Sequence, residues 1–194
     1  MPTRSHHTRH FLAAGGLAFA TELNRLYRAR WALTASRRQL HTPGCFASAI
    51  YRIESAERRG FAFVKSHSRP VNGASRRFVD GLWQLNGTGA AQPPWIRYPA
   101  TFAANRQGKC YLRTSDAEYL IVNHLAVIIA DEFAGRAAGT LALAIEYPPC
   151  ASCRKVIDRL RKAHPALLIS VQWPRYRSHK RISRNTVRRS LKRR

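Results

Sequence analysis

The chain has 194 residues, of which 45% are hydrophobic, so it is long enough to bury the core of one folded domain. Its charge is strongly one-sided, because 34 Lys and Arg residues against 10 Asp and Glu residues give a formal net charge of +24. Nothing in it approaches the run of roughly 18 apolar residues that spans a bilayer, so we expect no membrane-spanning segment.

The excess of positive charge favours a polyanionic partner. Nucleic acid is the first candidate, since Lys and Arg side chains displace the counterions that condense on phosphates. An anionic membrane surface is the second candidate, and a solvated basic surface without a partner is the third. Net charge bears on association and solubility, so it leaves the fold open.

The first 41 residues form a basic segment with Glu22 as its single acid. Residues 1–20 join a basic start to a short apolar stretch that ends in Ala-x-Ala, which is typical of a signal peptide. The Arg-rich, acid-poor composition is also typical of a transit peptide, and a leader or linker from a longer protein fits equally well. Apolar residues at helical spacing predict a basic helix over residues 21–40. We therefore expect residues 1–41 to be a partly helical leader or linker.

One folded domain is expected over residues 42–173, and the hydrophobic pattern of its first half is weak. An apolar stripe at helical spacing predicts a helix over residues 45–59, and residues 61–66 are typical of a strand. Residues 77–86 predict a weaker strand that contains Gly81, and the Gly- and Pro-rich residues 87–110 predict a long loop.

The second half of this domain alternates helix and strand. Apolar spacing predicts a mostly buried helix over residues 117–133 and another helix over residues 151–163. The apolar runs 140–146 and 166–172 predict central strands that are covered on both faces. This order predicts an α/β sandwich with a mixed sheet of about five strands flanked by helices.

The last 21 residues, 174–194, contain ten Lys and Arg residues and no acid. Such a segment cannot bury enough apolar surface to order itself, and its like charges repel one another. We expect a disordered basic arm.

The chemistry is concentrated in the stretch EYPPCASC, in which Cys150 and Cys153 lie between a predicted strand and a predicted helix. A Cys-x-x-Cys pair in a chain of this size is more often metal-binding or redox-active than a disulfide. The strand would deliver Cys150, and the first helical turn would return Cys153 to the same point. Amide groups at a helix N-terminus favour thiolates, so the pair suits a divalent metal.

Two thiolates leave a catalytic zinc site incomplete, since such a site takes three protein ligands and one open position. Asp116, at the start of the helix over residues 117–133, can ligate through oxygen, and Glu118 can point at the open position. Cys110 and His124 are alternative third ligands, although neither stands two residues from Glu118. A thiol-redox role would leave Asp116 and Glu118 without a purpose.

The pieces DAEYLI, GTLALAIE, PPCASC and AHPALLISV together resemble the zinc-dependent cytidine-deaminase-like superfamily, most closely the bacterial polymorphic-toxin deaminases that act on nucleic acid. The superfamily signature is His/Cys-x-Glu, a helix and a strand, and then Pro-Cys-x-x-Cys. The resemblance covers roughly residues 45–172 and implies a three-layer sandwich. Asp116 stands where His or Cys is usual.

The resemblance implies a Zn²⁺ site formed by Asp116, Cys150 and Cys153, with Glu118 as the catalytic proton shuttle. The implied reaction is hydrolytic deamination of cytosine to uracil in nucleic acid, with single-stranded DNA first because the base must be unstacked. Three further residues are implied by position: Tyr147 as a contact to the target base, and Ser66 and Asn72 as contacts to the sugar.

Trp83 and Trp95 lie among arginines and could stack on unpaired bases, although tryptophans in a domain of this size are more often part of the core. Alternative hypotheses for the substrate are RNA, adenine as the target base, or free nucleosides. An inactive nucleic-acid-binding protein with a structural zinc is the alternative from another class. The toxin resemblance also implies delivery as an effector into the cytoplasm of a target cell, and an immunity protein as a partner.

Overall fold

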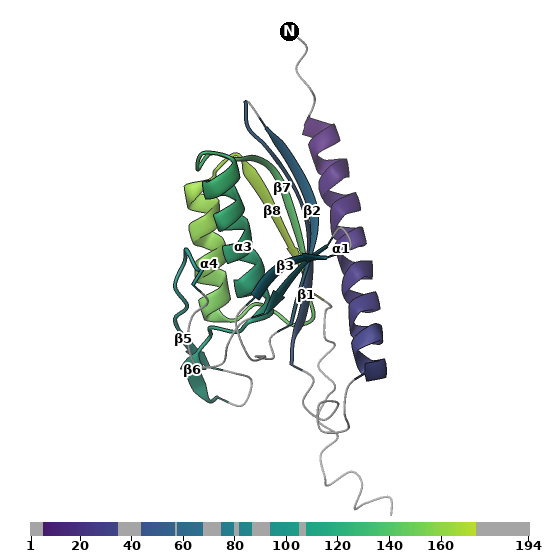
Figure 1. Ribbon diagram of the computed structural model, residues 1–194, viewed down its shortest axis with the longest axis vertical. Coiled ribbons are helices and arrows are strands. Elements are labelled where there is room, and N and C mark those ends of the chain that lie inside the picture. The colour runs from purple at the N-terminus through teal and green to yellow at the C-terminus, as the bar shows by residue number, and fades with distance from the viewer. Residues whose placement is uncertain are drawn as a thin grey trace, which may run out of the picture.

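A mixed six-stranded sheet forms the middle layer of the protein in the computed structural model, and helices cover both of its faces (Figure 1). The structure describes residues 6–34, 44–56, 58–67, 75–79, 82–86, 94–104 and 108–173. The helices are α1 (His6–Thr34), α3 (Ala117–Glu132) and α4 (Ala151–Ala163). Helices α3 and α4 pack on one face of the sheet, and α1 lies along the other.

The strands of the sheet are β1 (Phe46–Glu54), β2 (Arg59–His67), β3 (Ser75–Val79), β4 (Leu82–Asn86), β7 (Ala138–Ile145) and β8 (Leu167–Gln172). Their order across the sheet is β3-β4-β2-β1-β7-β8. The pairs β2–β4 and β7–β8 are parallel, and the other neighbours are antiparallel. Two short strands, β5 (Phe102–Ala104) and β6 (Cys110–Leu112), form a separate hairpin. The predicted three-layer α/β sandwich is confirmed, with six strands in place of about five.

The helix predicted over residues 45–59 is wrong, since this stretch contains β1 and the start of β2. Alternate residues of β1 face opposite helices: Ser48 donates a hydrogen bond to Asn24 of α1, whereas Tyr51 lies against His124 of α3. Because both faces of β1 are covered, six of its nine residues are apolar and the two-residue alternation of a half-exposed strand is missing.

The single strand predicted over residues 77–86 is also wrong. Strands β3 and β4 form an antiparallel hairpin there, with Val79 opposite Leu82. Residues 80 and 81 between them are Asp-Gly, the dipeptide that most strongly signals a two-residue hairpin turn. Strand β5 and the first residue of β6 fall within the loop predicted over residues 87–110.

The remaining predicted elements of the domain are confirmed as β2, α3, β7, α4 and β8, with ends within two residues of those expected. The helix predicted over residues 21–40 begins earlier, at His6, and is described as far as Thr34. The predicted basic arm, residues 174–194, lies outside the described residues. None of the helices within the described ranges is long and apolar enough to cross a membrane.

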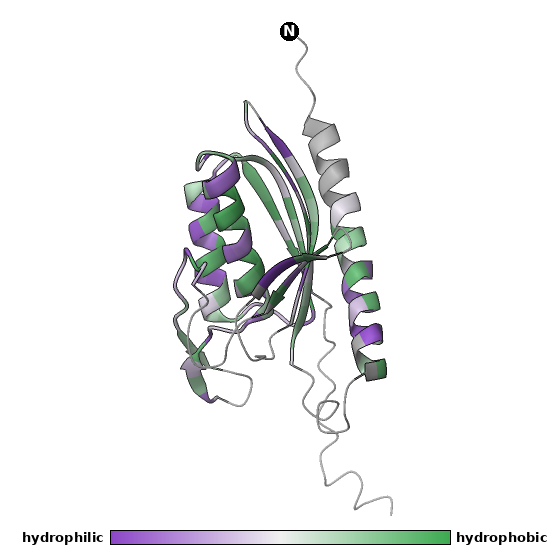
Figure 2. Cartoon of the chain, viewed as in Figure 1, coloured by the Kyte–Doolittle hydropathy of each residue, from purple (hydrophilic) through white to green (hydrophobic). Residues whose placement is uncertain are grey.

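Helix α3 is the central element of the core. Its residues from Ala117 to Ile129 are all buried. Figure 2 shows α3 as largely hydrophobic, whereas α4 alternates apolar and polar surfaces because its outer side faces solvent. Parallel strands β7 and β8 require a crossover connection, and α4 is that connection. The first turns of α3 and α4 therefore lie at the same end of the sheet.

Helix α1 is docked closely on the sheet. Ala20 is fully buried, and Tyr27 packs edge-to-face on Phe46 with ring centroids 5.2 Å apart. Near the start of β1 and the end of β7, Glu146 accepts a 3.0 Å hydrogen bond from the backbone amide of Phe46 and forms an ion pair with Arg28 of α1. Glu146 stands four residues before Cys150, so α1 braces the segment that leads to the Cys-x-x-Cys pair.

Gly16 and its neighbour Gly15 provide a matched test of this docking. A Cβ atom on Gly16 would lie 3.3 Å from Ile50 Cγ2 and 3.4 Å from Ala142 Cβ, whereas one on Gly15 would meet nothing within 4 Å. We expect Gly16→Leu to push α1 off the sheet and to lower the free energy of unfolding by about 1–3 kcal/mol. Gly15→Leu should leave it unchanged or raise it slightly, because Leu is the better helix former. Urea denaturation of both variants measures the difference, and equal stabilities would contradict the observed packing.

Candidate metal centre

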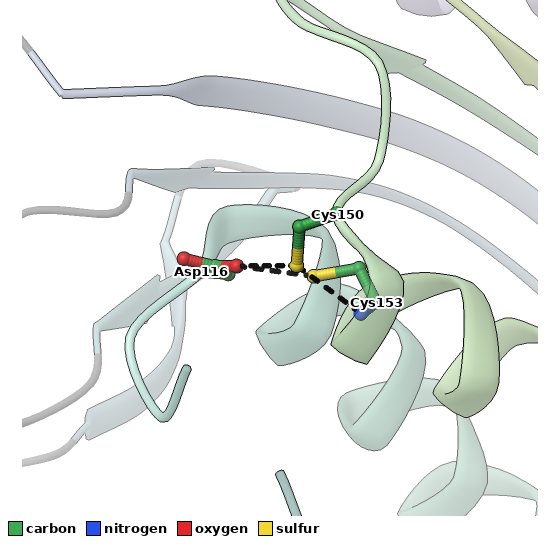
Figure 3. Close-up of side chains that lie close together, drawn as sticks. All are labelled: Asp116, Cys150 and Cys153. Atoms are coloured by element: carbon green, nitrogen blue, oxygen red, sulfur yellow. Dashed lines mark hydrogen bonds between the residues drawn. The ribbon is translucent and has the colours of Figure 1, made fainter. Parts of the chain in front are cut away.

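Three potential metal ligands converge where the first turns of α3 and α4 meet (Figure 3). Oδ2 of Asp116 lies 3.2 Å from the sulfur of Cys150 and 3.2 Å from the sulfur of Cys153. The three donor atoms all lie within 4.8 Å of one another. Asp116 and Cys153 are buried and Cys150 is half-buried, so the cluster is open on one side only.

Both helices begin at a ligand residue. Asp116 is the N-cap of α3, yet its side chain makes no capping hydrogen bond, because the carboxylate is turned toward the cysteines. Cys150 is the N-cap of α4, and its sulfur accepts a hydrogen bond of 3.4 Å from the backbone amide of Cys153. Helix N-termini carry partial positive charge, so both helices stabilise the negative form of these groups.

Arg113 completes the surroundings of Asp116. Its Nε donates a 2.8 Å hydrogen bond to the same oxygen, Oδ2, that faces the two sulfurs. The side chains of Arg113 and Asp116 are only 13% and 10% exposed. The guanidinium also stacks on the ring of Tyr111, with its central carbon 4.6 Å from the ring centroid, and donates to the Tyr111 hydroxyl.

Glu118 lies at the inner side of this cluster. It is 5% exposed, and its Oε2 makes no hydrogen bond within the part of the chain that the structure describes. Burial raises the pKa of Glu118, and hydrogen bonds from its own backbone amide and from Cys153 oppose that rise. A buried carboxylate oxygen without a partner is costly, so this atom could accept a hydrogen bond from a group that binds at the site.

The metal-free site holds protons that a cation would displace. The hydrogen bond with Cys153 lowers the pKa of Cys150 to about 4, despite the opposing effect of burial. Burial raises the pKa of Cys153 well above its ordinary value. Burial, followed by the nearby Glu118 charge, raises the pKa of Asp116 to about 8 and outweighs the opposing charge of Arg113. Cation binding would therefore release protons from these groups.

The donor set fits zinc. Thiolate sulfur and carboxylate oxygen are both zinc ligands, and three protein ligands beside one open position are typical of catalytic zinc. The buried Oε2 of Glu118 lies next to that cluster without a protein partner. The Asp116, Cys150 and Cys153 group could therefore bind a metal, as the sequence predicted.

The two alternative third ligands lie elsewhere. Cys110 is exposed in β6, and His124 is fully buried on α3. The His124 ring lies 4.7 Å from the Trp83 ring and 6.2 Å from the Tyr51 ring. Burial, with a smaller contribution from Arg76, lowers the pKa of His124 to about 3, so the ring is neutral.

The predicted substrate contacts occupy different environments. Tyr147 is half-buried, three residues before Cys150. Ser66 is buried in β2, and its hydroxyl donates to the Leu85 carbonyl at 3.4 Å. Trp83 and Trp95 are half-buried and pack against the core. Asn72 lies outside the described residues.

Sequence reasoning missed Arg113. The available signal is its position three residues before Asp116, a carboxylate expected at the start of a buried helix. Buried carboxylates are almost never left without a partner, so a nearby basic residue is the natural candidate. Its contacts with Asp116, Tyr111 and Cys150 depend on the turn that brings β6 to α3.

The sequence profile of a toxin-deaminase family, described as the BURPS668_1122 family of deaminases, matches residues 34–175. The match spans the sheet, α3, α4 and all three clustered ligands. The chain belongs to this family of deaminases. No curated protein and no solved structure matches it.

Membership makes the protein a bacterial toxin deaminase of the cytidine-deaminase-like superfamily, and its Asp/Cys/Cys group is similar to a zinc site. The sheet and the two parallel helices supply the scaffold, and the helix starts supply the reactive groups. The match begins at residue 34, the last residue of α1, so the rest of α1 lies before it.

The low pKa of Cys150 gives this deaminase a measurable property. An ordinary thiol has a pKa near 9.0, so its alkylation rate rises about tenfold per pH unit below that value. In the metal-free protein Cys150 is already a thiolate above about pH 4, so its rate should be flat between about pH 5 and about pH 8. Burial raises the pKa of Cys45 and Cys153, which should stay unreacted at the acid end.

Iodoacetamide labelling with peptide mass spectrometry measures these rates. A Cys150 rate that climbs through this range as for a free thiol would contradict the lowered pKa of Cys150. Labelling of the Cys153→Ala variant is the matched control, since it removes the side-chain hydrogen bond that contributes most to the lowered pKa of Cys150 and should restore part of the pH dependence.

Proposed function

We propose that this deaminase hydrolyses cytosine to uracil in nucleic acid, with single-stranded DNA as the preferred substrate. The observation that carries the proposal is the buried, unpartnered Oε2 of Glu118 beside the Asp116, Cys150 and Cys153 cluster. A proton-transfer group next to a metal-ligand cluster is the arrangement that hydrolytic deamination of a base requires.

Asp116, Cys150 and Cys153 would hold Zn²⁺ between the starts of α3 and α4. When bound, zinc supplies Lewis-acid chemistry and makes water a better nucleophile near neutral pH. The two helix N-termini orient the ligands. The buried wall formed by α3 excludes bulk water from the inner side of the site, since every residue of its first three turns is buried.

Glu118 moves the proton. Its carboxylate takes a proton from the attacking water and delivers it to N3 of the base. It then takes the proton of the new hydroxyl group on C4 and delivers it to the leaving amine. A C–O bond forms at C4, the C–N bond to the amine breaks, and the products are uracil and ammonia. The raised pKa of Glu118 brings it closer to the neutral range in which it must both accept and donate a proton.

The proposed substrate follows from the net charge of the protein and from how a base can reach the site. A net charge of +24 suits a polymer of phosphates better than a free nucleoside. The base must leave its stack to reach the site, which costs least in a single strand. Tyr147 would contact the target base, Asn72 the sugar, and Trp83 and Trp95 neighbouring bases. Ser66 is not proposed as a sugar contact, because it is fully buried in β2 and its hydroxyl is bonded to the Leu85 carbonyl. RNA as substrate and adenine as target base are the competing outcomes of the test.

Membership of a toxin-deaminase family supports a role as an effector delivered into the cytoplasm of a target cell. A producing cell that carries a nucleic-acid deaminase needs protection, so an immunity protein would be its partner. The predicted domain, residues 42–173, and the basic arm, residues 174–194, would divide catalysis from electrostatic attraction to the polyanion.

The test is incubation of purified protein with single-stranded DNA, double-stranded DNA and RNA, followed by sequencing for C-to-U and A-to-I changes. We expect C-to-U changes, most in single-stranded DNA, and a loss of about 100-fold to 10,000-fold in Glu118→Gln. Glu132→Gln, on the exposed end of the same helix, should retain full activity. A wild-type protein that binds zinc but edits nothing would overturn the enzymatic proposal.

Metal dependence has its own test. We expect one zinc per chain by elemental analysis, and a large loss of bound zinc in Cys153→Ser, because a thiolate ligand is removed. Chelation should lower the melting temperature of the wild type, since ligands that bind only the folded state stabilise it. Cys110→Ser removes an exposed cysteine outside the cluster and should keep its zinc. Full zinc content in Cys153→Ser would contradict the assigned ligand set.

A further inference from the structure

We propose that Arg113 is the positioning residue that allows an aspartate to serve as the third metal ligand. It would hold Asp116 in the ligating orientation and compensate the additional negative charge that an aspartate brings. The inference rests on the zinc site proposed above and concerns how this chain's own residues complete it.

Asp116 lacks the restraint that its position would normally provide. An N-cap aspartate ordinarily accepts a hydrogen bond from the backbone of its own helix, and Asp116 makes no such bond. Its restraint comes from Arg113, whose Nε donates to Oδ2 at 2.8 Å. A carboxylate oxygen has two lone-pair sites, so Oδ2 can accept from the guanidinium and still face the sulfurs of Cys150 and Cys153.

Arg113 is itself held in place. The guanidinium is stacked on Tyr111 and donates to the Tyr111 hydroxyl, while the side chain is only 13% exposed. An arginine that served a phosphate backbone would present its head to solvent. Arg113 instead directs its donors at groups of the protein, which is the behaviour of a residue that orients a metal ligand.

The net charge of the metal site gives a second reason for the role of Arg113. Two thiolates neutralise the charge of Zn²⁺, so a site with a neutral histidine as third ligand has no net charge. An aspartate at position 116 leaves one negative charge in a mostly buried site. The guanidinium of Arg113 beside Oδ2 cancels that charge. The pair Arg113 and Asp116 is therefore the electrostatic equivalent of one neutral histidine.

This equivalence predicts that the two positions are coupled. In the wild-type background, Arg113→Gln should lower zinc affinity about tenfold to a hundredfold, since loss of a group that orients a ligand typically has that effect. In the Asp116→His background, the guanidinium of Arg113 would face a neutral third ligand but would keep its interaction with the sulfur of Cys150. There, Arg113→Gln should lower zinc affinity less than it does in the wild-type background.

The experiment is a double-mutant cycle of zinc affinity, measured by competition with a chromophoric chelator on the full chain. The variants are Arg113→Gln, Asp116→His, and the two combined, with Arg113→Lys to separate charge from the planar donor geometry. Arg113→Lys should fall between wild type and Arg113→Gln. Cobalt absorption spectra of each variant report the ligand set without reference to activity, and thermal melting of the metal-free forms reports folding.

Arg97→Gln is the matched control, because Arg97 also pairs with an aspartate, Asp131 at 3.1 Å, but on the exposed end of α3. It should leave zinc affinity unchanged. Equal effects of Arg113→Gln in the two backgrounds, or no effect in the wild type, would overturn the inference while leaving the zinc site intact. A wild type that binds no zinc would instead overturn the proposed function on which the inference rests.

Discussion

The starts of α3 and α4 meet at a single carboxylate oxygen, Oδ2 of Asp116, and the organisation of the site depends on that contact. The oxygen lies 3.2 Å from each of two sulfurs and 2.8 Å from a guanidinium nitrogen. Such a concentration of negative groups is unfavourable in a buried place unless positive charge is close. Two helix N-termini and Arg113 supply it, and a bound cation would complete it.

The sheet makes this meeting possible. Strands β7 and β8 run parallel, so α4 must return across the sheet and begin at the end where β7 finishes. Helix α3 is buried along more than three turns, which leaves its N-terminus little freedom to move. On the far face, α1 reaches the same end through the ion pair between Arg28 and Glu146. Each layer thus contributes to where Cys150 lies.

The residues of the candidate site were easier to predict from the sequence than the strands in the first half of the domain. A Cys-x-x-Cys pair and an Asp-x-Glu triplet at helix starts are local patterns, and local patterns constrain where side chains point. Strand β1 was predicted as a helix because both of its faces are covered, so its residues carry no alternation. The hairpin of β3 and β4 went unrecognised, although Asp80-Gly81 signals such a turn.

The sequence by itself determined the ligand types, their spacing, the helices that carry them and the class of sandwich. Only the tertiary structure decided which residues complete the site. Arg113 reaches Asp116 because β6 turns back toward α3, and α1 closes the second face of the sheet because Gly16 permits close approach to Ile50 and Ala142. Contacts of this kind join different segments of the chain. The hydrophobic periodicity of a segment predicts its secondary structure but does not show which other segment it packs against or pairs its charges with.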